Sequence, residues 1–177
     1  MLTLVFLVSA SGAVAHSGHP PSPAVQGNGL STQVLFIGAD RAHSTLTVSV
    51  RITNTADTPV YLAIVGPEPL ALDNKGGVHR ISQISGMAKC VYLSNSSIDG
   101  CITNQRGHLP GNSFTLLPPK VPTLVNILFK AEDLQPDALI SFTMNAALAR
   151  GPRPTNRRSN EQKIEYINIH LPLLPID

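Results

Sequence analysis

The feature that most constrains the fold is a strict alternation of apolar and polar residues in the stretch STLTVSVRITN. Four aliphatic residues alternate there with four polar ones: Leu46, Val48, Val50 and Ile52 with Thr47, Ser49, Arg51 and Thr53. Successive side chains of a β-strand point to opposite faces, so this pattern predicts a strand with one buried and one solvated face.

Comparable strand patterns recur along the chain, separated by turn residues at fairly regular spacing. We predict strands at residues 60–65, 114–117, 125–129, 140–144 and 167–171, and a hairpin at 70–83 whose turn contains Asn74, Gly76 and Gly77. At most one helical turn is expected, at residues 131–134. Seven or more strands without an amphipathic helix predict an all-β fold, an antiparallel β-sandwich of immunoglobulin-like type.

The first 15 residues fit a secretion signal. An apolar run from Leu2 to Leu7 precedes Ala13-Val14-Ala15, the small-x-small pattern of a cleavage site. No Lys or Arg precedes Arg41, so either the start lies upstream or the amino group of Met1 supplies the only positive charge. The run is shorter than the roughly 20 apolar residues of a transmembrane helix. We therefore expect a secreted, periplasmic or cell-surface protein without a transmembrane segment.

Three segments follow from this assignment: a signal peptide at 1–15, a flexible tail at 16–31 rich in Pro, Gly and Ser, and a β-sandwich domain at 32–177. Removing the first 15 of 177 residues leaves 162, within the usual size of one domain. The formal charge of only +2 does not indicate a specific nucleic-acid binder.

The two cysteines, Cys90 and Cys101, lie in the longest irregular stretch, residues 85–112. In an exported chain such a pair predicts one disulfide, which closes and stiffens a long loop. Loops of this length in compact domains are often functional. Within the cysteine loop, Asn95-Ser96-Ser97 matches the acceptor motif for N-glycosylation, which matters only in a host with that machinery.

Three turn-containing stretches carry a resemblance to a known family: VRITNTADTPVYL, LALDNKGGVHRI and FTLLPPKVPTLVNILFKAEDL. Over residues 34–172 the chain resembles the telokin-like group of secreted bacterial immunoglobulin-like domains. The resemblance implies an immunoglobulin-like sandwich and transfers no catalytic residue to this sequence. The stretch at 85–112 and the arginine-rich loop depart from the group's pattern.

Two histidines near the cleavage site suggest a metal site. If cleavage follows Ala15, His16 offers copper its terminal amine and its imidazole, and copper(II) favours such nitrogen ligands. Cleavage one residue later would make Ser17-Gly18-His19 a copper-binding tripeptide. A further ligand would come from His43, His79, His108 or His170, and nothing in the sequence selects one. The competing interpretation is a disordered start with two exposed histidines, His16 and His19, and no cofactor.

Four of the eight arginines gather in RGPRPTNRRSN: Arg150, Arg153, Arg157 and Arg158. Guanidinium groups on a loop stiffened by proline can grip phosphate, sulfate or carboxylate. No aromatic residue lies beside them to stack on bases. The alternative is a solvated connection between two strands.

Motifs for hydrolytic catalysis are absent from the sequence: there is no G-x-S-x-G, no H-E-x-x-H and no recognisable pair of carboxylates. Asp57, Asp73 and Asp99 sit beside predicted turns, where they accept local backbone hydrogen bonds. We therefore expect a binding or assembly module with a protein or an anionic surface as its partner. The alternative is a copper-binding protein or copper-dependent oxidase that uses His16.

Overall fold

The structure is a computed structural model that describes residues 21–87, 89–90, 92–93, 96–97, 114–135, 137–152 and 164–176. These residues form the strands β1 (Val25–Gly27), β2 (Leu30–Asp40), β3 (Thr45–Asn54), β4 (Val60–Asp73), β5 (Val78–Ser85), β6 (Lys89–Cys90), β7 (Tyr92–Leu93), β8 (Ser96–Ser97), β9 (Thr115–Leu117), β10 (Pro122–Lys130), β11 (Leu139–Arg150) and β12 (Ile164–Pro175). A single 3₁₀ turn, η1 (Arg41–His43), is the only helical element in these ranges. Within them, therefore, nothing resembles a helix able to cross a bilayer.

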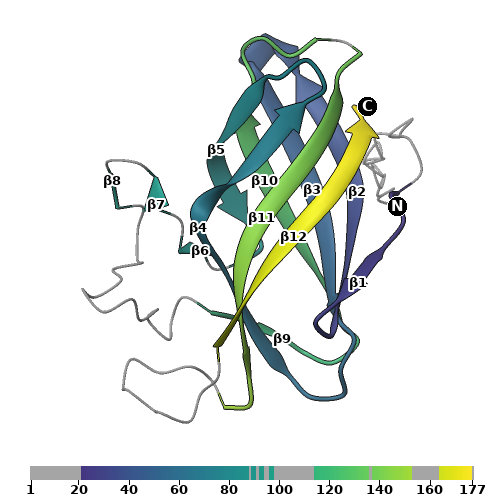
Figure 1. Cartoon of the computed structure of the whole chain (residues 1–177), viewed down its shortest axis with the longest axis vertical. Helices are drawn as coiled ribbons and strands as arrows, with labels where there is room; N and C mark the ends of the chain where they lie inside the picture. The colour runs from purple at the N-terminus through teal and green to yellow at the C-terminus, as the bar shows by residue number, and fades with distance from the viewer. Residues whose placement is uncertain are drawn as a thin grey trace, which may run out of the picture.

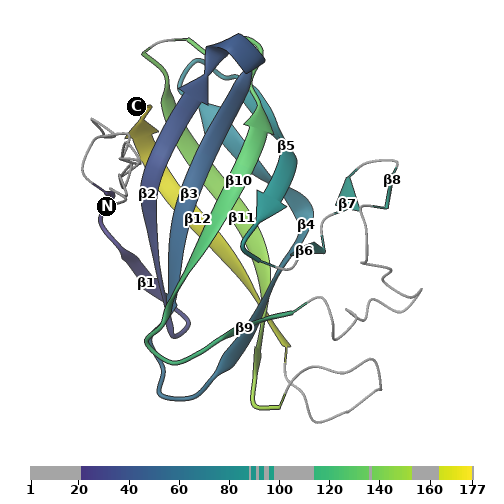
Figure 2. The same ribbon diagram turned by 180° about the vertical axis from the view of Figure 1, so that it is seen from behind.

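The long strands belong to one sheet that curls over on itself. Its order is β1-β2-β3-β10-β5-β4-β11-β12, with β6 and β9 paired to β4, and β7 and β8 form a separate pair. The strand pairs are antiparallel except for the short parallel pair of β4 with β6. Figures 1 and 2 show two layers, with β4, β11 and β12 on one side and β2, β3 and β10 on the other. The all-β, antiparallel prediction is confirmed.

The alternation that opened the sequence analysis lies on β3, between β2 and β10. All four aliphatic residues are completely buried: Leu46, Val48, Val50 and Ile52. Across the core, the rings of Phe129 on β10 and Phe142 on β11 meet edge to face with centroids 6.1 Å apart. This geometry is one of the two that aromatic pairs favour, and it joins the two layers. The predicted facing of β3 is therefore confirmed.

The strands β4 and β11 are buried on both faces over residues 62–65 and 146–149. Besides the central core, a second apolar cluster contains Ala63 and Val65 from β4, Ala147 and Ala149 from β11, and Phe114. The small alanine side chains leave room for the Phe114 ring above the strands. This double burial explains why residues 146–149 are continuously apolar, where a strand with one wet face would alternate.

The ordered sheet begins earlier than the predicted domain boundary at residue 32. Strand β1 and the start of β2 lie inside the predicted 16–31 tail and form a hairpin with each other. Their two-residue turn has positive φ at Asn28 (52°) and Gly29 (71°), the combination of a type I′ turn. Ser22 also lies along β2, because its amide donates to the Val34 carbonyl at 3.0 Å. The Asn-Gly pair was the sequence signal for this hairpin.

Two other expectations concern local structure. Residues 131–134 make a non-helical turn, and the one helical turn is η1. Strand β6 contains Cys90, whereas Cys101, Asn95 and most of the 85–112 stretch lie outside the described residues. The disulfide and the glycosylation question therefore remain sequence predictions.

Candidate polar binding site

The β4–β5 hairpin ends in a turn organised by one carboxylate. Asp73 Oδ1 accepts hydrogen bonds from the amides of Lys75 and Gly77, both at 2.8 Å. Only one of the three predicted turn residues has positive φ, Gly76 at 92°. Gly77 is required for a different reason, since a Cβ atom there would collide with the Asp73 carboxylate. The predicted turn role of Asp73 is confirmed.

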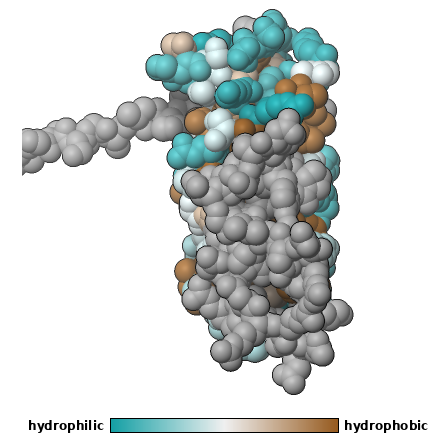
Figure 3. All heavy atoms as spheres, turned by 90° about the vertical axis from the view of Figure 1, so that its left-hand side faces the viewer, coloured by the Kyte–Doolittle hydropathy of each residue, from teal (hydrophilic) through white to brown (hydrophobic). Residues whose placement is uncertain are grey.

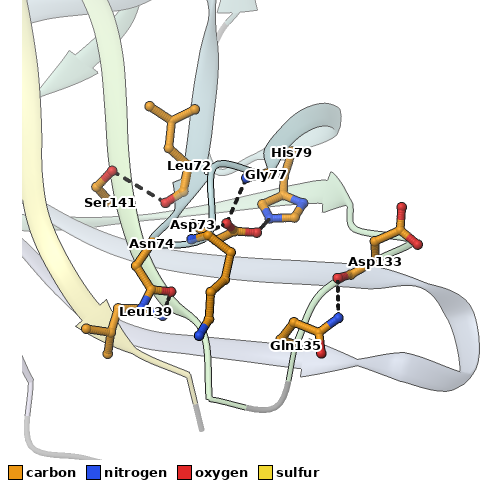
Figure 4. Close-up of polar contacts among 10 residues, drawn as sticks. Leu72, Asp73, Asn74, Gly77, His79, Asp133, Gln135, Leu139 and Ser141 are labelled. Atoms are coloured by element: carbon orange, nitrogen blue, oxygen red, sulfur yellow. Dashed lines mark hydrogen bonds and ion pairs between the residues drawn. The ribbon is translucent and has the colours of Figure 1, made fainter.

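The neighbouring Asn74 joins this hairpin to β11. Its Oδ1 accepts from the amide of Leu139 at 3.0 Å, and its own amide donates to the Leu139 carbonyl at 3.0 Å. Figure 4 shows these contacts beside the bond from Ser141 to Leu72. The turn is therefore fixed on two sides, and side chains that project from it start from a rigid backbone.

A buried acid–base pair lies under the turn. Asp73 Oδ2 is 3.0 Å from His79 Nε2, and both side chains are only 6% exposed. Burial raises the pKa of Asp73, but the bonds from the Gly77 and Lys75 amides and from His79 outweigh it and leave the pKa lowered. Asp73 is thus an ionised acceptor, so the Nε2 of His79 carries a proton and donates to it.

An aspartate bonded to a histidine is also two-thirds of a hydrolytic triad. A triad needs a nucleophile hydrogen-bonded to the second ring nitrogen. Among the described residues no hydroxyl or thiol makes that bond to His79. Figure 4 shows the second nitrogen pointing away from Asp73. The pair therefore stabilises the hairpin, and the second ring nitrogen, Nδ1, points away from Asp73.

Beside this pair is a pocket of about 510 Å³. Its walls come from the β4–β5 hairpin and from the end of β10 with the loop that follows: Asp73, Lys75, Gly77, Val78, His79, Arg80, Lys130, Glu132, Asp133 and Gln135. This volume lies in the range of small-molecule sites. Figure 3 shows that the end of the molecule uppermost in Figure 1, which carries the hairpin, is largely hydrophilic on the face in view. The pocket suits a polar ligand.

Two cations of this pocket stand opposite each other on neighbouring strands. Arg80 on β5 and Lys130 on β10 are register partners, and both are exposed. Directly opposed side chains of an antiparallel pair have Cβ atoms about 4.5–5.5 Å apart, where like charges repel. Neither makes an ion pair with a carboxylate of the described residues. Lys75, by contrast, makes an ion pair, with its Nζ 3.5 Å from Asp137 Oδ2.

Of the predicted arginine cluster, only Arg150 lies within the described residues, and its contacts are structural. Its Nη2 donates to the Asn28 carbonyl at 2.6 Å and lies 4.0 Å from Glu165 Oε2. The guanidinium thus ties the β1–β2 turn to the beginning of β12. Arg153, Arg157 and Arg158 lie outside the described residues. Arg150 and the pocket occupy opposite ends of β11, a strand of 12 residues that spans about 36 Å.

The histidines expected as metal ligands are dispersed. His43 bonds Asp40 at 2.7 Å, His79 bonds Asp73, and His170 bonds the Thr143 hydroxyl at 3.0 Å. In the described ranges no three His, Cys, Asp or Glu side chains come together as a metal site. His16, His19 and His108 lie outside those ranges, so the copper hypothesis remains a prediction.

Sequence reasoning missed Arg80, Lys130 and His79 as one site. Arg80 and Lys130 are 50 positions apart, and only the pairing of β5 with β10 brings them together. Periodicity places Arg80 on the wet face of its strand but does not identify its neighbour. The sequence does contain a signal for the Asp73–His79 pair: an Asp-x-x-x-Gly turn is followed two residues later by a histidine that can reach back to the aspartate.

Comparisons with known proteins leave the relationship of the chain open. The sequence matches no family model and no curated protein. Among solved structures, the yeast GGA1 GAE domain (P21) superposes with a TM-score of 0.42 at 10% identity, over 86% of this chain and 98% of that one. The PapD-like domain 7 of human CEP192, an ASH/PapD-like domain, gives 0.37 at 11% identity, over 96% and 94%. At these scores neither likeness defines the fold type or a partner of this chain.

Proposed function

We propose that this protein is an exported binding module of immunoglobulin-like sandwich type, and that its binding site is the polar pocket between the β4–β5 hairpin and the loop after β10. The observation that carries the proposal is the Arg80–Lys130 pair: two exposed cations, face to face on neighbouring strands, without a carboxylate partner among the described residues. Such a pair is unfavourable at rest and becomes favourable when an anionic group lies between its members.

The rigidity of the surrounding elements supports a binding role. The hairpin turn is fixed by Asp73 and Asn74, and Lys130 ends a strand whose preceding residue, Phe129, is fully buried. Groups held on rigid elements lose little conformational freedom when they bind a ligand. Export is supported by the apolar run and the Ala-Val-Ala site of the sequence. The immunoglobulin-like assignment is supported by the two antiparallel layers.

A ligand panel tests the binding role. Anionic, cationic, zwitterionic and neutral small molecules are titrated into ¹⁵N-labelled protein, and amide shifts are followed. We expect at least one charge class to shift residues 73–80 and 130–135, and the ligand to be recovered chemically unchanged. Shifts confined to other regions, or conversion of the ligand, would contradict the proposal.

A matched pair of variants sharpens this test. Gln135 lines the pocket, whereas Gln83 is exposed on β5 outside it. Gln135→Trp should fill the pocket and abolish the shifts caused by the ligand. Gln83→Trp adds the same side chain on β5, outside the pocket, and should leave them intact. Equal effects of the two substitutions would place the binding elsewhere.

A further inference from the structure

The pocket presents two kinds of binding group on different walls, and together they define a ligand chemistry. On the strand wall, Arg80 and Lys130 are cationic donors. On the loop wall, Glu132, Asp133 and Gln135 offer oxygen acceptors, and from β5 the ring of His79 adds its second nitrogen, Nδ1. Glu132 and Asp133, like the two cations, make no ion pair within the described part of the chain.

The two walls require opposite features in one ligand. A carboxylate or phosphate group suits Arg80 and Lys130, since ionised acceptors make the stronger hydrogen bonds with such donors. The carboxylates of Glu132 and Asp133 can only accept, so they suit hydroxyl groups. A polyanion would bring further negative charge against those acids and be repelled.

From this juxtaposition we propose that the pocket binds a small hydroxylated molecule of about sugar size with a single anionic group, a sugar acid or a sugar monophosphate, with that group between Arg80 and Lys130 and its hydroxyl groups toward Glu132, Asp133 and His79. The inference rests on the proposed binding function and names its ligand class. The volume of about 510 Å³ accommodates a hexose-sized molecule.

The experiment measures dissociation constants of the full chain for five probes at constant ionic strength, by calorimetry or amide shifts. Gluconate and glucose 6-phosphate carry both features and distinguish the carboxylate source from the phosphate source. Acetate has only the charge, glucose has only the hydroxyl groups, and heparin is a polyanion. We expect gluconate or glucose 6-phosphate to bind at least about tenfold more tightly than acetate and glucose. Acetate lacks the hydrogen bonds to the acids, and glucose lacks those to the cations, and both sets are charge-assisted.

Variants with matched charge locate the site. Arg80→Gln and Lys130→Gln should each weaken binding of the preferred probe about tenfold. Arg51→Gln is the control, because it removes the same charge from the same face of the sheet. Arg51 lies on β3, six residues or about 20 Å from Thr45, the residue that pairs with Lys130. It should change the affinity less than about twofold at 0.1 M salt, where the screening length is about 10 Å.

The outcomes separate the inference from the function on which it rests. Binding of cationic or neutral probes alone at residues 73–80 and 130–135 would overturn the anionic ligand class and leave the binding module standing. The inference would also be overturned if heparin bound most tightly, or if Arg80→Gln and Arg51→Gln lost the same affinity for the preferred probe. If no probe class shifts the pocket residues, the proposed function fails together with it.

Discussion

The two ends of β11 use charged residues in opposite ways. Near Arg150 the guanidinium bonds a backbone carbonyl and approaches Glu165, so its donors hold the β1–β2 turn in place. Near Leu139 the turn is satisfied by Asp73 and Asn74, whose acceptors take up the local amides. There Arg80 and Lys130 have no structural task in the described part of the chain.

The difference shows that the number of arginines in a stretch does not identify a binding surface. What matters is whether the fold supplies acceptors to each cation. At one end the Asn28 carbonyl in the β1–β2 turn accepts a hydrogen bond, and Arg150 donates it. At the other end Asp73 and Asn74 already accept from the local amides, and the cations remain available to a ligand.

The largest effect is expected from a change in the core that supports both ends. Val50→Asp places an unpaired carboxylate at a fully buried position and should lower the free energy of unfolding by about 3–5 kcal/mol. Ser49→Asp, on the opposite face of β3, should cost about 1 kcal/mol or less. Urea unfolding measures both, and equal losses would mean that the facing of β3 is incorrect.

The next effect concerns the hairpin end alone. Asp73→Ala removes the acceptor of two turn amides and the partner of buried His79, and should cost about 2–3 kcal/mol. Asp73→Asn is the control, since it keeps Oδ1 for the turn and should cost less. Thermal unfolding of the two variants at pH 7 ranks them, and a harmless alanine variant would contradict the role of the carboxylate.

The same residue predicts a dependence on pH. The pKa of Asp73 is lowered in the fold, so its stabilisation is complete above the ordinary carboxyl value of 3.8 and is lost as the pH falls from there through the lowered folded pKa. Asp73→Asn should therefore lose less stability than the wild type between pH 5 and pH 2, which acid unfolding curves measure. Parallel curves would show that Asp73 does not titrate in this range.

The prediction for the cysteines involves a similar free energy of unfolding, but it concerns neither end of β11. A Cys90–Cys101 disulfide closes a short loop, and its reduction should cost about 2–3 kcal/mol. Intact mass before and after reduction should show one disulfide in a chain that begins at His16. Two titratable thiols in freshly secreted protein would remove the basis for an oxidising compartment.

The smallest effect is expected at the Arg150 end. Arg150→Gln loses a partly exposed tie and should cost about 1 kcal/mol or less. Faster hydrogen exchange should be confined to β1 and the Asn28-Gly29 turn, and the pocket should bind as before. Exchange that also accelerates at residues 73–80 would break the separation of the two ends.

Much of the fold could be predicted because strands carry a local signal. The alternation at Leu46 to Ile52 fixed the facing of β3, and the Asp73 turn was recognisable from its residues. β1 was missed because a three-residue strand with entirely exposed side chains has no apolar period. The site was missed because Arg80 and Lys130 meet only through pairing across 50 positions, which no local pattern records.

The most direct test of the central claim is a double-mutant cycle between Arg80 and Lys130 in ligand-free protein at low salt. The account predicts an unfavourable interaction of about 0.2–1 kcal/mol between the two cations, which added salt removes. Each of the substitutions Arg80→Gln and Lys130→Gln would then destabilise the wild-type protein less than it destabilises the variant that already carries the other substitution. An interaction of zero, or a favourable one, at low salt would show that the cations are already compensated within the protein and would contradict the account.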